Sequence, residues 1–181
     1  PELPILSFLV AIPTCNDVLI QFNLLDSINF DNFNIYPVPD YISDTTQSGA
    51  FGLLEEFSYD TATYQNDTWL PGITAEVVDR GAIRAQQVVR VLFYPIHFNP
   101  VLQEVWAFSK AKITLTFIDP TGPIQQETGI FNEVLGNTLI NYTSNGLNAS
   151  VNICKNNPPL DCLDFWVTSL PNEQIDDPCD Y

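Results

Sequence analysis

The chain has 181 residues, and 45% of them are hydrophobic, so it can bury a core and is not a disordered acidic tail. Its 22 acidic residues outnumber its 6 basic residues, which gives a net charge of −16. Nucleic acids and anionic membranes both require clusters of Lys and Arg, so neither is expected as a direct partner. No apolar run reaches the length of a membrane-spanning helix, so no membrane span is predicted.

The first half of the chain predicts short β-strands separated by turns. Residues 5–12 and 18–25 are apolar runs of strand length, and the Pro, Asn and Asp between them favour a turn. Residues 36–49, YPVPDYISDTTQSG, combine Pro, Ser, Thr and Gly without periodicity. They predict a long irregular surface loop, and loops of this length inside a compact domain tend to be functional.

The second half predicts further strands that each bury one face. Residues 74–96 predict two strands joined by a turn at Asp79–Gly81. Residues 104–119 predict two more strands, and the second alternates apolar and polar residues as a sheet with one solvated side does. Its apolar face comprises Ile113, Leu115 and Phe117, and its polar face comprises Lys110, Lys112, Thr114 and Thr116.

Only residues 130–142 predict a helix. The residues with helical spacing are Ile130, Val134, Leu135 and Leu139. Residues 1–145 therefore predict an all-β domain, an antiparallel, jelly-roll-like β-sandwich of about eight strands with one short C-terminal helix. Residues 146–181 are rich in turn-forming residues and predict a loop-rich linker.

His97 is the only histidine, and it decides whether the chain is interpreted as an enzyme. It lies in an extended segment between Ile96 and Phe98, so its side chain faces opposite to both. Asn99 and Pro100 then begin a turn. Because nothing in the sequence marks a catalytic partner for His97, we interpret it as a structural residue and predict no catalytic site.

The four cysteines do not form a metal site. None is part of a Cys-x-x-Cys pair, one histidine cannot complete a zinc set, and the acidic pairs lack the pattern of a calcium loop, so we predict no metal or cofactor. An even number of cysteines favours an oxidising compartment. A bond from Cys154 to Cys162 would leave Cys15 to pair with Cys179, although three pairings are possible and buried free thiols are the alternative.

Three sequence blocks resemble, in order and spacing, the N-terminal domain of gingipain-like cysteine peptidases, peptidase family C25. They are PELPILSFLVAIP (residues 1–13), YPIHFNPV (residues 94–101) and FNEVLGNTLINY (residues 131–142). The resemblance covers residues 1–145, and the final CDY looks like the approach to that family's catalytic domain. It therefore implies that residues 146–181 lead into a catalytic domain that is absent from these 181 residues.

The resemblance implies a non-catalytic prodomain that acts as a chaperone, and as an inhibitor, of its own downstream catalytic domain. Its location would be extracellular or on a bacterial cell surface. We take the loop from Asp40 to Glu56 as the restraining element. The best-known family members offer a basic residue to the specificity pocket, but this loop contains no Lys or Arg, so it does not fit a pocket that carries a carboxylate.

Two alternative functions remain open. One is a permanently retained structural domain of a surface protein similar to the sortase of the type IX secretion system, with other cell-surface or secretion-system proteins as further partners. The other is a glycan-binding β-sandwich that uses exposed aromatic side chains. The candidate aromatic residues for that function are Tyr41, Tyr59, Tyr64, Trp69, Trp106 and Trp166.

Overall fold

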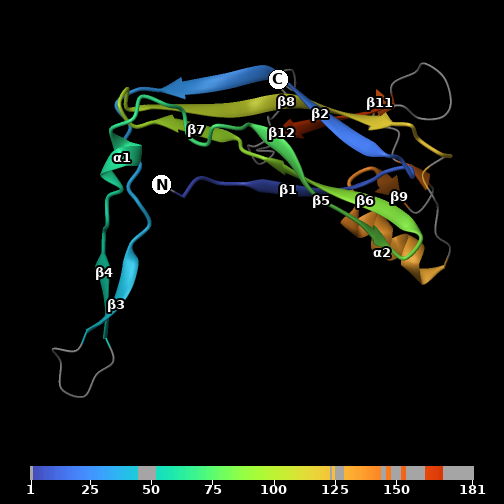
Figure 1. The fold of residues 1–181 in the computed structure, drawn as a ribbon, viewed down its shortest axis with the longest axis horizontal. Helices are drawn as coiled ribbons and strands as arrows, with labels where there is room; N and C mark the ends of the chain where they lie inside the picture. Colours follow the sequence, from blue (N-terminus) through green and yellow to red (C-terminus); the bar gives the residue numbers. More distant parts are fainter. Residues whose placement is uncertain are drawn as a thin grey trace, which may run out of the picture.

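Two antiparallel sheets face each other across one core in the computed structural model (Figure 1), which describes residues 2–44, 52–122, 124, 129–143, 146–147, 152–153 and 162–168. The first sheet has the order β1 (Leu6–Ala11), β6 (Gln86–Phe93), β5 (Ala75–Ile83). The second has the order β11 (Asn152–Ile153), β12 (Cys162–Thr168), β8 (Glu104–Ile118), β2 (Asp17–Phe30), and β7 (Ile96–Asn99) also pairs with β8. The all-β, antiparallel, sandwich-like class is confirmed.

The other elements lie at the ends and on one outer face of the sandwich. They are the hairpin of β3 (Asp40–Asp44) and β4 (Gly52–Glu56), the pair β9 (Tyr142–Thr143) and β10 (Gly146–Leu147), and the helices α1 (Thr61–Tyr64) and α2 (Ile130–Thr138). In the described part of the chain, neither helix is long and apolar enough to cross a membrane.

β8 organises the second sheet because both of its edges are paired. One edge pairs with β2 over almost the whole strand, from Ile118 opposite Asp17 to Val105 opposite Phe30. The other edge pairs first with β7 and then with β12, end to end. β12 therefore belongs to the sheet although it lies within residues 146–181, which the sequence predicts to be a loop-rich linker.

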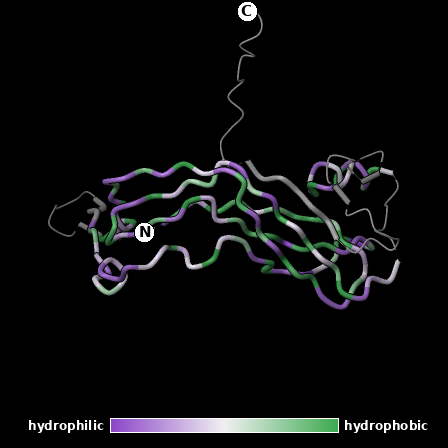
Figure 2. The backbone as a smooth tube through the Cα atoms, turned by 90° about the horizontal axis from the view of Figure 1, so that it is seen from above, coloured by the Kyte–Doolittle hydropathy of each residue, from purple (hydrophilic) through white to green (hydrophobic). Residues whose placement is uncertain are grey.

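The core follows the alternation that the sequence predicts. From Ala111 to Phe117 in β8 and from Val89 to Phe93 in β6, every second residue is buried between the two sheets, while the residues between them are exposed or only partly buried. Figure 2 shows the alternation of hydrophobic and hydrophilic residues along the strands. The buried residues of these strands in the main core are Val89, Val91, Phe93, Phe108, Ala111, Ile113, Leu115 and Phe117.

Helix α2 covers the outer face of the first sheet. Its Leu135 and the following Leu139 pack with Ala11 of β1 and Val88 of β6 in a second, smaller cluster. These two strand residues adjoin Val10 and Val89, which face the main core. The period of two therefore lets the first sheet bury apolar side chains on both of its faces.

Asn141 fastens the segment after α2 to the outer edge of β1. Its side chain is 1% exposed, and it accepts a hydrogen bond from the Ala11 N–H and donates one to the Ala11 C=O, each at 2.8 Å. The N–H of Ile140 donates to the Leu9 C=O at 3.0 Å. These bonds satisfy backbone groups on the edge of β1 that faces away from β6.

Several predicted details of the elements are wrong. The predicted turn at Asp79–Gly81 lies inside β5, close to a register shift between Val77 and Asp79. The turn falls instead at Arg84, whose φ of 56° lies in the left-handed region. Residues 104–118 form one strand instead of two. The described residues contain twelve strands rather than about eight, and α1 is a second helix.

The predicted irregular loop at residues 36–49 is also corrected. Residues 40–44 form β3, which pairs with β4 from Asp40 opposite Glu56 to Asp44 opposite Gly52. Tyr41 and Ile42 favour extended backbone, but residues 36–49 show no periodicity by themselves, because the strand that pairs with them begins only at Gly52. The predicted helix at residues 130–142 is confirmed in position, but it ends at Thr138.

We expect replacement of Asn141 by Leu to lower the free energy of unfolding by about 2–4 kcal/mol, because two buried backbone groups of Ala11 would lose their partners. Urea denaturation of the purified chain measures this change. Asn137, exposed on α2, provides the control, and its replacement by Ala should change stability by less than about 0.5 kcal/mol. Equal losses for the two variants would contradict the role assigned to Asn141.

Candidate functional site

A hairpin projects from one end of the sandwich (Figure 1) and is called here the arm, residues 31–60. Its outer part is the β3–β4 pair, and its legs return to the body of the domain next to β2 and α1. The first leg is tied to the turn after β7, because the N–H of Phe33 donates to the C=O of Gln103 at 2.8 Å. The arm therefore starts from a fixed point on the second sheet.

Three tyrosines join the two legs at the base of the arm. The Tyr36 and Tyr59 rings lie 6.3 Å apart and the Tyr59 and Tyr64 rings 5.3 Å apart, both edge to face. The Tyr64 hydroxyl donates to the C=O of Ile35 at 2.9 Å. Asp60 caps α1 by accepting hydrogen bonds from the N–H groups of Ala62 and Thr63. Specific side-chain contacts and hydrogen bonds thus hold the base of the arm in place.

The arm exposes a dense set of large apolar side chains. Between 44% and 64% of each is accessible. They are Phe33, Tyr36, Val38, Tyr41, Ile42, Phe57 and Tyr59. Single exposed apolar residues need no explanation, but a group of this size on one projecting element is typical of an interaction surface.

The end of the domain that carries the arm has acidic residues and no basic residues. Residues 31–76 and 94–109, which form the arm and the segments around its base, contain nine acidic residues and no Lys or Arg. The basic residues of the described chain lie instead on β5, β6, the turn between them and β8. The field at the arm therefore favours a neutral or cationic partner surface.

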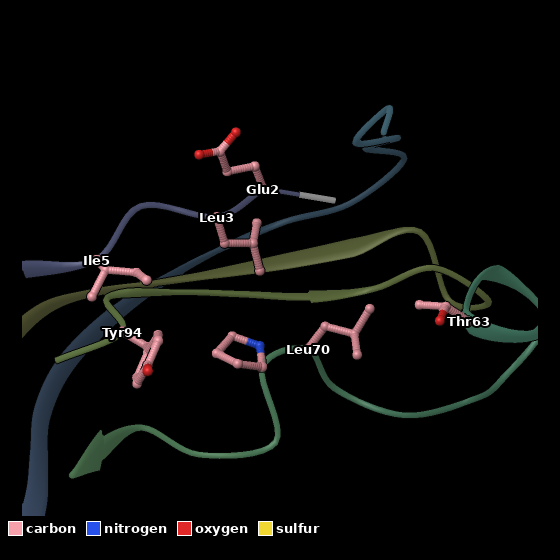
Figure 3. Close-up of a pocket in the computed structure, with 7 residues that line it drawn as sticks. Glu2, Leu3, Ile5, Thr63, Leu70 and Tyr94 are labelled. Carbon is pink, nitrogen blue, oxygen red and sulfur yellow. The ribbon is translucent and has the colours of Figure 1, made fainter. Parts of the chain in front are cut away.

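Two hollows open beside the base of the arm, and Pro71 lines both of them. The first has a volume of about 430 Å³, and Figure 3 shows the Leu3, Ile5, Leu70 and Tyr94 side chains around it. Its remaining lining residues are Glu2, Thr63 and Pro71. The second has a volume of about 300 Å³ and lies against Trp69 and Trp106.

The segment YPIHFNP, residues 94–100, supplies the hydrogen bonds that connect the segments around the base of the arm. The Tyr94 hydroxyl donates to Glu76 Oε1 at 2.7 Å. Asn99 is 1% exposed, and it donates to Asp67 Oδ1 at 2.8 Å while its Oδ1 accepts from the N–H groups of Val101 and Leu102 at 3.0 and 3.1 Å. Asn99 thereby closes the turn after β7 and anchors the segment that carries Trp69.

His97 packs inside this framework. It is 7% exposed, and its ring lies 4.7 Å from the Phe108 ring. One ring nitrogen bonds to the backbone of Tyr94, and Nε2 has no hydrogen-bond partner. Burial lowers the pKa of His97 below its ordinary value of 6.5, so the ring is neutral at pH 7. These contacts are those of a packed residue, as the sequence interpretation expects.

The other aromatic residues singled out in the sequence do not gather at one site. Tyr41 is on the arm, Tyr59 and Tyr64 are at its base, and the Trp69 and Trp106 rings lie 5.1 Å apart, which the sequence could not predict. The side chain of Trp166 is outside the described residues. Among the described residues, no three His, Cys, Asp or Glu side chains form a group that could hold a metal ion.

The predicted disulfides stay predictions. Cys15 is a buried free thiol in the described structure, and burial raises its pKa. Cys154 and Cys179 lie outside the described residues, so neither the bond from Cys154 to Cys162 nor that from Cys15 to Cys179 is tested.

The exposed apolar side chains of the arm are typical of a surface that contacts another protein. The family model Propeptide_C25 matches residues 1–149, so the chain belongs to the propeptide family of C25 peptidases, and the predicted resemblance is confirmed. As a propeptide domain, the chain is non-catalytic.

One solved structure agrees with the family at the level of the fold. The complex of Porphyromonas gingivalis RgpB pro- and mature domains contains a chain with a TM-score of 0.58 and 23% identity, with 78% of this chain and 72% of that chain covered. A structure on zymogenic latency of gingipain K from Porphyromonas gingivalis gives a TM-score of 0.43 and 14% identity, with 59% and 58% covered. A search of curated proteins found no match.

The buried, neutral His97 predicts a pH-dependent stability. The His97 ring of the unfolded chain takes up a proton near pH 6.5, whereas that of the folded chain does so only at lower pH. The free energy of unfolding should therefore be highest above pH 6.5 and should fall as the pH drops below 6.5. Replacement of His97 by Phe should remove this component while keeping the ring contact with Phe108. Urea denaturation of both chains between about pH 7.5 and about pH 5 measures the difference, since most carboxylates titrate lower. Parallel profiles would contradict the prediction.

Proposed function

We propose that this domain binds the catalytic domain of its own C25 precursor, assists its folding and restrains its activity until the two are separated. Membership of the propeptide family supports this proposal. In the RgpB structure the pro- and mature domains of that protein form a complex. For this chain, the partner would be the catalytic domain that follows in the same precursor.

The arm is the proposed docking element, and its exposed apolar side chains are the observation that carries the proposal. An extended hairpin can enter a substrate cleft of a peptidase, where its apolar residues would be buried. Its base is fixed by the tyrosine contacts and by the bond from Phe33 to Gln103, which lowers the conformational entropy that the base would lose on binding.

The composition of the arm also restricts its target. Residues 31–60 include six acidic residues and no Lys or Arg. A specificity pocket that carries a carboxylate would leave that charge unpaired when the arm bound. We therefore propose that the restrained enzyme has a cleft that accepts apolar or neutral side chains.

The proposed location is extracellular or on a bacterial cell surface, with export by a type IX secretion system. The cysteine count and the family support this location. A permanently retained structural domain of a sortase-like surface protein is the competing proposal, since it needs no basic cleavage site.

Addition of the 181-residue chain in trans to the separately produced catalytic domain tests the proposal. A restraining prodomain should bind and lower peptidase activity with a peptide substrate. A structural domain that is never released would leave the activity unchanged, and its deletion from the precursor would instead unfold the remainder. Intact mass of the native mature protein separates these cases independently, because only a prodomain is cut away.

Replacement of Tyr41, Ile42 and Phe57 by Ser should weaken inhibition by about a hundredfold or more, since each buried apolar anchor contributes on the order of 1–2 kcal/mol. The inhibition constant against the catalytic domain measures this effect. A matched control carries Ser at Leu19, Ile130 and Val134, which are also exposed but lie on β2 and α2. Equal weakening by the two triple variants would contradict docking through the arm.

A further inference from the structure

The second hollow is an aromatic pocket, called here the tryptophan pocket. Its lining includes Trp69, Pro71, Thr74, His97, Trp106 and Phe108, and its volume is about 300 Å³. The Trp69 and Trp106 rings lie 5.1 Å apart with 48° between their planes. Trp106 is 39% exposed, so the pocket is open to a partner.

Two elements hold the tryptophans in place. Leu70 and Phe98 exchange backbone hydrogen bonds of 2.9 Å in each direction, which fixes the residue before Leu70 beside β7. Trp106 lies on β8 directly opposite His97 of β7. The pocket is therefore built on paired strands, and its aromatic faces are preorganised for a ligand.

A polar group lies among these apolar walls. His97 is more than nine-tenths buried and lines the pocket, and its Nε2 has no hydrogen-bond partner. Because His97 is neutral at pH 7, it offers an acceptor nitrogen and no positive charge. Such a pocket does not repel a cation, and a buried acceptor without a partner favours a ligand that donates hydrogen bonds.

The surrounding charge also selects a cation. Asp67 lies two residues before Trp69 in the chain, and the 2.8 Å bond from Asn99, the last residue of β7, holds its carboxylate. No Lys or Arg occurs in residues 31–76 or 94–109. Tryptophan faces attract cations through their quadrupole, and a field of one sign from nearby carboxylates adds to that attraction.

We propose that the tryptophan pocket binds a cationic side chain, an arginine in preference to a lysine, presented by the catalytic domain. A planar guanidinium stacks on an indole face and carries several donors in a fixed arrangement. The identity of the partner rests on the proposed function, but the chemistry of the ligand does not. The pocket would be a second anchor beside the arm, and it would set the position of the domain on its partner.

The chemistry is tested with the 181-residue chain and N-acetyl-arginine amide, with N-acetyl-citrulline amide as the neutral isostere. Indole N–H signals in ¹H–¹⁵N NMR spectra report on each tryptophan separately. The arginine probe should shift the Trp69 and Trp106 signals and bind about threefold or more tightly than the citrulline probe. Equal binding of the two probes, no shift at tens of millimolar, or a shift caused by D-glucose and not by arginine would overturn the proposal.

Variants at Trp106 separate cation recognition from simple apolar contact. Affinity for the arginine probe should fall in the order Trp, Phe, Leu, because the negative face of the ring weakens and is then lost while an apolar side chain remains. Circular dichroism of each variant shows whether it is folded. Replacement of Phe33 by Leu, on the arm, is the matched control and should leave probe binding unchanged. Loss of binding in the control, or equal binding by the Phe and Leu variants, would contradict the assignment.

The partner is tested by binding of the catalytic domain to the wild-type chain and to the Trp106→Leu variant. We expect the variant to bind severalfold more weakly and the loss to be smaller at high salt. If the wild-type chain binds and the variant binds equally well, the pocket is not an anchor and the proposed function stands. If the wild-type chain does not bind at all, the proposed function fails, and the probe titration still decides what the pocket recognises.

Discussion

The pairing of β8 on both edges is the constraint on which the rest of the structure depends. Its apolar face supplies the fully buried core residues that the described part of the second sheet contributes, and its two edges position β2 on one side and β7 and β12 on the other. The end of β8 that pairs with β7 carries Trp106 and adjoins the turn to which the arm is tied. A stable sandwich therefore fixes, at one end, every element that we assign to recognition.

The two recognition elements differ in their physical chemistry. The arm offers exposed apolar and aromatic side chains on a hairpin that extends away from the core. The tryptophan pocket lies on the body of the domain and combines two adjacent, tilted indoles with a neutral histidine. The arm and the tryptophan pocket both lie where the chain has carboxylates and no basic residue. A partner with an apolar cleft and a basic rim would therefore bind the two elements together. This division, with apolar anchoring by one element and charge-selective positioning by the other, is common in protein interfaces.

The alternation of apolar and polar residues along the strands made the core predictable from the sequence. The hairpin of the arm and the pairing of the tryptophans depend on contacts between distant residues, so the sequence did not predict them. The alternation of Ile113, Leu115 and Phe117 depends only on neighbours in the sequence, so it predicted the buried face of β8 correctly. The β3–β4 hairpin was missed because its two strands are separated along the chain and neither is strongly apolar. The contact between Trp69 and Trp106 follows from the Leu70–Phe98 bridge, which no local pattern encodes. The family resemblance did find the segments that contain Asn99 and Asn141, and both side chains prove to be buried backbone-binding amides.

Hydrogen–deuterium exchange of the 181-residue chain, free and bound to the catalytic domain of its precursor, tests the central claim most directly. The claim is that the domain docks through the end that carries the arm. We predict slower exchange on binding in peptides from residues 31–42, 52–76 and 96–108, with little change in α2 and in the turn between β5 and β6. Protection confined to α2 and that turn, with the arm unchanged, would contradict the account.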